Sequence, residues 1–211
     1  MKKLLLFVLL LAVGAAGYYY YRSLKQGPNG ALVAAAAAVQ THDMATFEKY
    51  VDVNSVTGHL VDQLTTQSSL LGALNPGSMV FKGALRLLKP QLTKAAHNEV
   101  RRYVETGSLE GAAEAAPKGL GRVSLAALAG KVVGSGSSFR GVKYSRQEGE
   151  QALVGLEFTQ PKYDTTMVLE VKLLHRGDHW QMTEITNTGD LLQGAARLEK
   201  RRLLGESSGN R

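Results

Sequence analysis

Between Val142 and Met182 the chain contains several runs in which apolar residues return at every second position, which is the pattern of β-strands with one buried face. The even positions are apolar from Ala152 to Phe158, and the odd positions are apolar from Tyr163 to Leu173. Even parity then returns at Trp180 and Met182. A shift of one residue in any pairing would turn a whole strand over, so the turns between the strands are tightly constrained.

Three turns bring these residues to a single apolar face. A three-residue loop at Glu148-Gly149-Glu150 aligns Tyr144 with Val154 and Val142 with Leu156. An even-length loop around Pro161-Lys162 puts Phe158 and Met167 on one face. A two-residue turn at Arg176-Gly177 pairs Leu173 with Trp180 and Val171 with Met182. Ile185 is apolar at an odd position, whereas Trp180 and Met182 are at even positions; one extra residue in a β-bulge near Thr183 would bring all three to the same face. The pattern predicts a four-stranded antiparallel meander.

The residues before this sheet follow a helical pattern. An alanine-rich segment, 31–40, is followed by Asp43 as an N-cap. Asn54 or Ser55 should cap the next helix, and a further helix should run to Val104, with Pro90 breaking or kinking it. Ser108 and Ser124 should cap two short helices. Asp190 should cap a last helix whose Leu191, Ala195 and Leu198 face inward.

A sheet with one apolar face must be covered, and the helices are the cover that the chain offers. We therefore expect an α+β fold, with helices packed on the meander in a cone that can leave a pocket between the two layers. The expected divisions are a signal anchor or transmembrane segment (1–25), a linker (26–30), one domain (31–204) and a disordered tail (205–211). Within the domain we expect a helical part (31–130), the sheet (139–187) and the final helix (190–203).

The amino terminus reads as a membrane segment. Lys2 and Lys3 precede an apolar run, Leu4 to Tyr21, that would span about 27 Å as a helix, close to the hydrocarbon thickness of a bilayer. Tyr18, Tyr19, Tyr20, Tyr21 and Arg22 resemble an aromatic belt at the membrane interface. We expect a single-pass protein of the bacterial inner (cytoplasmic) membrane with its folded domain in the periplasm. Small residues at Gly14, Ala15 and Ala16 leave open cleavage and release as a secreted periplasmic protein.

Composition excludes several classes of site. There is no cysteine, so the chain has no disulfide, thiolate metal site or cysteine nucleophile. The net charge is +7, but the one dense basic cluster, Arg197 to Leu204, favours a solvated helix face over a lipid or partner contact. No basic stripe is interleaved with aromatic residues, so we expect no nucleic-acid partner.

Residues that could carry chemistry are sparse. His175 and His179 flank a turn without a third ligand, so we expect no metal site, and no cofactor motif is present. No G-x-S-x-G motif occurs, and Asp43, Asp52 and Asp62 are better explained as caps and helix surface. We therefore expect no enzyme. The best candidates for a ligand pocket are apolar residues of the sheet: Tyr144, Phe158, Trp180 and Met182.

Gly30 to Leu64 resembles the start of an uncharacterised bacterial family, the DUF2939 proteins. The resemblance is carried by the alanine-rich helix, Asp43, Phe47 and the Tyr50-Val51-Asp52 step. His179 to Asn187 is similar to the last strand of NTF2-like folds, in which a tryptophan begins a bulged strand. Together they imply a membrane-associated or exported protein with an NTF2-like cone, and no catalytic residue.

These observations lead to a ranked expectation of function. First comes a membrane-anchored, periplasmic, non-enzymatic domain that binds a small apolar ligand or another envelope protein. The alternative is a structural scaffold subunit of an envelope or secretion assembly. A small hydrolase or isomerase working in the cone is third.

Overall fold

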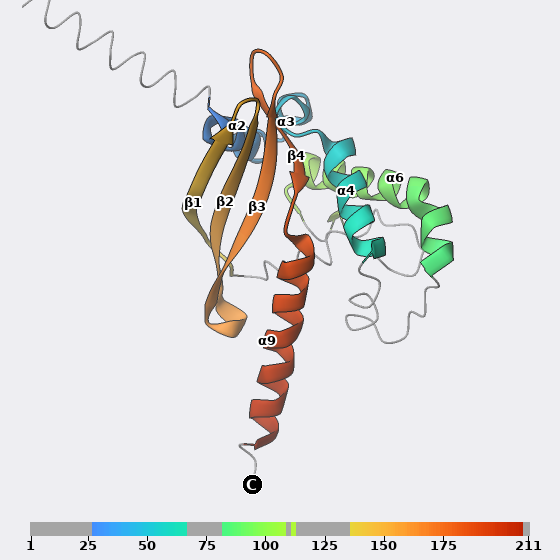
Figure 1. Ribbon diagram of the computed structural model, residues 1–211, viewed down its shortest axis with the longest axis vertical. Helices are drawn as coiled ribbons and strands as arrows, with labels where there is room; N and C mark the ends of the chain where they lie inside the picture. Colours follow the sequence, from blue (N-terminus) through green and yellow to red (C-terminus); the bar gives the residue numbers. More distant parts are fainter. Residues whose placement is uncertain (1–26, 67–81, 109–110, 113–135, 209–211) are drawn as a thin grey trace, which may run out of the picture.

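The computed structural model describes residues 27–66, 82–108, 111–112 and 136–208. These residues form an α+β fold in which helices accompany a four-stranded antiparallel sheet (Figure 1). The helices are α2 (Pro28–Gln40), α3 (Met44–Tyr50), α4 (Val53–Thr66), α6 (Lys82–Thr106) and α9 (Thr188–Ser208). The strands are β1 (Phe139–Glu148), β2 (Gln151–Gln160), β3 (Thr165–His175) and β4 (Trp180–Ile185), with a 3-10 turn, η1 (Pro161–Tyr163), between β2 and β3.

The predicted meander is confirmed. The strand order is β1-β2-β3-β4, with every neighbouring pair antiparallel. The loop from Pro161 to Asp164 has an even length, and Phe158 lies opposite Met167 as expected. The alternation of apolar residues therefore fixed both the topology and the buried face of the two central strands.

The β3–β4 turn lies one residue later than predicted. Arg176 donates its backbone N–H to the His179 carbonyl at 2.8 Å, so Gly177 and Asp178 form the turn. Gly177 has a φ of +92°, which a residue with a side chain rarely adopts. Trp180 accordingly lies opposite His175, and Met182 lies opposite Leu173, two residues from the predicted partners but on the same face.

The predicted bulge at Thr183 is confirmed. Met182 pairs with Leu173, whereas Glu184 pairs with Lys172, so Thr183 is the extra residue. Beyond it, Ile185 lies opposite Val171. The bulge restores the apolar parity at the end of β4.

The β1–β2 hairpin required a larger correction. Its turn has two residues, because Glu148 pairs directly with Gln151, and Gly149 has a φ of +59°. Val142 lies opposite Leu156 as predicted. A register shift between Val142 and Tyr144 then places Tyr144 opposite Gly155, not Val154. Tyr144 therefore belongs to the outer face of the sheet, since opposite residues share a face.

The helices pack against the inner, apolar face. α2 contacts β1, β2 and β4, α4 contacts β4, and α9 contacts β3. The main core cluster is almost fully excluded from solvent and consists of Ala31, Ala152, Val154, Val171, Leu173 and Trp180. A second cluster joins α2 to the α3–α4 connection through Ala35, Val51 and Val53.

Helix boundaries agree with the sequence at some positions only. Asp43 caps α3 by accepting from the Thr46 N–H at 3.0 Å, as predicted. α4 begins earlier than expected and is capped by Asp52, not by Asn54 or Ser55. α6 continues through Pro90 from Lys82 to Thr106, so the proline does not end it.

α9 begins at Thr188, so Asp190 lies in its first turn and is not its cap. It ends at Ser208 and so includes part of the predicted tail. The anchor (1–25), with Tyr18, Tyr19, Tyr20, Tyr21 and Arg22, and the expected cap Ser124 lie outside the described residues. Among the helices that are described, none combines the length and apolar character needed to cross a membrane.

Candidate functional site

The four residues predicted to line a pocket do not meet. Trp180 and Phe158 are buried on the inner face of the sheet, and Trp180 belongs to the main core cluster. Met182 packs against both core clusters, and its carbonyl accepts from the Asp52 N–H at 2.8 Å. Tyr144 lies on the outer face because of the register shift in β1. The inner-face members therefore act first as packing residues.

Tyr144 instead joins a polar cluster on the outer face. Its hydroxyl donates to Glu170 Oε2 at 2.7 Å, and the Thr186 hydroxyl donates to Glu170 Oε1 at 2.5 Å. The side chain of Asn187 accepts from the Glu170 N–H at 2.9 Å and donates to the Val168 carbonyl at 2.8 Å. The cluster ties β1 and the end of β4 to β3.

The electrostatics of this cluster oppose acid–base chemistry. Hydrogen bonds from Thr186 and Tyr144 hold the pKa of Glu170 below its ordinary value. The hydrogen bond to Glu170 raises the pKa of Tyr144. Arg146 lies over the Tyr144 ring at 4.7 Å from its centroid. At neutral pH the carboxylate is ionised and the phenol is protonated, so neither is poised to exchange a proton.

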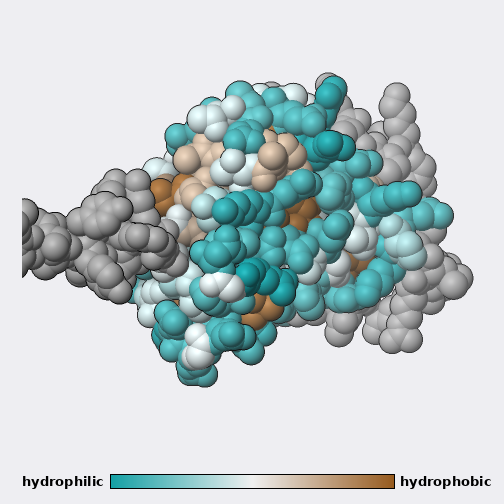
Figure 2. Space-filling model, turned by 90° about the horizontal axis from the view of Figure 1, so that it is seen from above, coloured by the Kyte–Doolittle hydropathy of each residue, from teal (hydrophilic) through white to brown (hydrophobic). Residues whose placement is uncertain are grey.

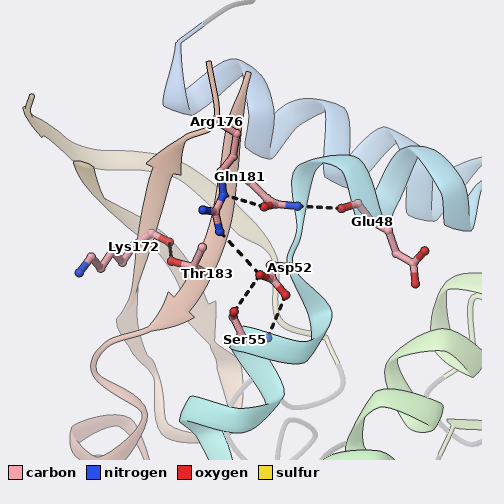
Figure 3. A network of polar contacts seen from close by, with 7 residues as sticks. All are labelled: Glu48, Asp52, Ser55, Lys172, Arg176, Gln181 and Thr183. Atoms are coloured by element: carbon pink, nitrogen blue, oxygen red, sulfur yellow. Dashed lines mark hydrogen bonds and ion pairs between the residues drawn. The ribbon is translucent and has the colours of Figure 1, made fainter. Parts of the chain in front are cut away.

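A second network docks the β3–β4 hairpin on the helices (Figure 3). Arg176 donates to Gln181 at 3.1 Å and lies 3.8 Å from Asp52, and Gln181 donates in turn to the Glu48 carbonyl at 3.0 Å. Asp52 also accepts from the backbone and hydroxyl groups of Ser55. One carboxylate thus serves both as the cap of α4 and as the anchor of the hairpin.

The histidines of the hairpin have aromatic partners. The His175 ring lies 5.1 Å from Trp180, and the His179 ring meets Tyr50 edge-on at 5.9 Å. The His179 Nδ1 atom lies 2.6 Å from Asp178. In the part of the chain that the structure describes, no group of three or more acidic or histidine side chains could hold a metal ion. Asp62, the third aspartate considered as helix surface, pairs with Lys89 at 2.7 Å.

The surface of the molecule offers a more distinctive feature at strand β1. Seen from above, the molecule is largely hydrophilic with small separate apolar areas (Figure 2). On β1, however, Phe139 and Val142 are 66% and 44% exposed. Both pair with apolar residues of the inner face, Phe158 and Leu156. The face that forms the core elsewhere is thus open to solvent at this edge.

The two edges of the described sheet differ. At β4, Met182 forms a parallel bridge with Val51, so the α3–α4 connection covers that edge. At β1 nearly every side chain is exposed, including the cations Arg140, Lys143 and Arg146. We call Phe139, Val142 and these three cations the β1 edge surface. Sequence reasoning missed it, although the loss of alternation after Tyr144, where Arg146 and Glu148 follow, is typical of a strand that buries neither face.

Comparison with known proteins adds no relative: no family model, no curated protein and no solved structure matches this chain.

Proposed function

We propose that this protein is a membrane-anchored, periplasmic, non-enzymatic domain that binds another envelope protein through the β1 edge surface. The observation that carries the proposal is the exposure of Phe139 and Val142 on the face that elsewhere forms the core. Exposed apolar side chains rimmed by polar groups mark protein interaction sites. Arg140 lies between Phe139 and Val142 in the strand and supplies polar surface beside them, whereas Lys143 pairs with Glu157 at 3.2 Å and Arg146 covers the Tyr144 ring on the outer face.

A protein partner is favoured over a small apolar ligand. Three of the four residues expected to line a ligand pocket contribute to the core, since Trp180 is 5% and Phe158 7% exposed and Met182 packs against both core clusters. In our proposal the helices and the sheet form an NTF2-like cone whose interior is filled by these side chains. The domain would then act as a scaffold subunit or adaptor at its surface, which unites two of the functions expected from the sequence.

The location at the membrane rests on the apolar run Leu4 to Tyr21 and the tyrosines at its end. Fractionating cells that express the full chain with a carboxy-terminal tag, and sequencing its amino terminus, tests this part alone. We expect an intact amino terminus in the membrane fraction. A soluble protein that begins at Ala16 or Gly17 would show that the segment is cleaved.

Photo-crosslinking tests the β1 edge surface. A photoreactive residue at Val142 in the full chain, expressed in its native membranes, should give one crosslinked species of defined mass. Val33 is also strongly exposed, at 70%, but lies on α2 and serves as the matched control position. We expect no such species from Val33, and we expect Phe139→Ser to weaken crosslinking from Val142.

Two outcomes would contradict the proposal. Equal crosslinking from Val33 and Val142 would show that the contacts are not specific to β1. A rise in melting temperature and a change in Trp180 fluorescence on adding fatty acids or lipid extracts would favour the small apolar ligand instead, because a ligand that binds only the folded state stabilises it.

A further inference from the structure

The exposed face of α9 carries the basic cluster of the sequence. Arg197, Lys200, Arg201 and Leu204 follow one another at helical spacing, and all four side chains are exposed. Residues at this spacing share one face of a helix. Leu204 is 61% exposed, so the face combines three cations with an apolar residue at its end.

The acidic residue within this cluster is engaged elsewhere. Glu199 bonds to Lys162 at 2.8 Å, to the Tyr163 hydroxyl at 2.9 Å and to Arg202 at 3.0 Å. Arg197 donates to the neutral amide of Gln193, at 3.4 Å. Among the described residues, no carboxylate pairs with Arg197, Lys200 or Arg201. Within the part of the chain that the structure describes, the positive charge of this face is therefore not neutralised.

The place of this face in the fold leaves it accessible. α9 is held by its contacts with β3, α4 and η1, the last of them through Glu199. Its second half extends past the end of the sheet, toward the opposite end of the molecule from the start of α2 (Figure 1). A projecting helix with a cationic face and a flanking leucine suits the plane between lipid headgroups and acyl chains.

We propose that this face of α9 binds the anionic surface of the membrane that holds the amino-terminal segment. The domain then lies with its long axis along the bilayer, attached at the start of α2 and at the end of α9. This inference rests on the membrane anchor of the proposed function and adds an orientation and a lipid class to it. Complementary charge is the main attraction, and Leu204 adds a shallow apolar contact.

A fluorescent label at Leu204→Cys tests the contact directly, because the chain has no other cysteine. The labelled full chain is reconstituted into vesicles of phosphatidylcholine alone or of phosphatidylcholine with phosphatidylglycerol, each containing a quencher on the lipid chains. We expect quenching only in the anionic vesicles and its loss at high salt, which screens the attraction.

Charge variants supply the matched comparison. Arg197→Gln, Lys200→Gln and Arg201→Gln together should weaken the contact of α9 with anionic lipid by roughly 100-fold, given the usual contribution of each basic residue near such a surface. The control combines Lys94→Gln, Arg101→Gln and Arg102→Gln, which are also exposed, lie on α6 and remove the same charge. We expect the control to be quenched like the parent, and melting curves of both variants verify that they fold.

Failure of this inference is distinct from failure of the anchor. Sedimentation of the whole chain with the vesicles reports on the anchor, whereas quenching at position 204 reports on α9. A chain that sediments with the vesicles but shows no quenching would overturn the inference, and so would equal quenching in both lipids. A basic face that only complements the helix dipole, or that binds an acidic protein, would give the first of these results.

Discussion

The ring of Tyr144 lies over the backbone of Gly155, so close that a β-carbon at position 155 would be 2.5 Å from the ring. The absence of a side chain at Gly155 lets the tyrosine reach across β2 to Glu170 on β3, which is itself paired with Gly155. A glycine in the second strand thus makes room for a hydrogen bond between the first and third strands.

Gly155→Ala should therefore destabilise the protein. The added methyl group must displace a ring that is held by the Glu170 carboxylate and covered by Arg146. We expect a loss of about 1–3 kcal/mol, the usual cost of overpacking, measured by urea unfolding. When Tyr144 is first replaced by alanine, Gly155→Ala should cost much less stability than it does in the parent protein.

Gly58→Ala is the control for this prediction. Gly58 lies inside α4, and nothing lies within 4 Å of a β-carbon placed there. Alanine is favoured over glycine in a helix, so this change should stabilise the fold by about 0.5–1 kcal/mol. Similar effects of the two substitutions would contradict the close contact between Tyr144 and Gly155.

The hydrogen bonds of Glu199 predict how the stability of the folded protein depends on pH. Hydrogen bonds from Arg202, Lys162 and Tyr163 lower the pKa of Glu199 from 4.5 to about 2. Because the folded-state pKa is depressed, the ionised carboxylate stabilises the fold at every pH above the unfolded value. This contribution is lost as the pH falls from about 4.5 to about 2.

Urea unfolding across this pH range, with Glu199→Gln as the comparison, checks the prediction. The variant should be less stable than the parent at neutral pH, and the difference should vanish toward pH 2. Salt should reduce the difference, because the cluster is partly exposed. A gap between the two proteins that does not change with pH would show that the carboxylate charge is not involved.

Trp180 should be among the most costly residues to truncate. It is 5% exposed and packs in the core cluster beside Val154 and Leu173. Trp180→Ala should cost about 3–5 kcal/mol, measured by thermal or urea unfolding. Phe139→Ala, at the exposed edge, should change stability by no more than about 0.5 kcal/mol. A large loss from Phe139→Ala would mean that this edge is part of the core and not a binding surface.

Asp52 should matter more than its neighbour Asn54. Asp52 caps α4 through Ser55 at 2.9 Å and also faces Arg176 in the hairpin. Asp52→Ala should cost about 1–2 kcal/mol, the range for a lost N-cap. Asn54 is exposed in the first turn, so Asn54→Ala should have little effect. Comparable unfolding midpoints for the two variants would contradict the assignment of the cap.

The limits of sequence reasoning are clearest in the hairpin turns. Alternation predicted that Trp180, Leu173 and Met182 share a face, and it also predicted the bulge at Thr183. It did not predict the pairing of Trp180 with His175. A displacement of two residues leaves every side chain on its original face, so a pattern of period two cannot detect it.

The sequence by itself determined the order of the described helices and strands, the buried face of β2 and β3 and the cap at Asp43, because these depend on local periodicity and on hydrogen bonds between near neighbours. The tertiary structure decided that Tyr144 turns outward, that Asp52 serves both α4 and the hairpin, and that Phe139 and Val142 stay exposed. These features depend on contacts between residues distant in the chain and on which part of the sheet the helices reach. The loss of alternation within β1 indicates a poorly buried strand, but which of its side chains stay exposed depends on its neighbours in the fold.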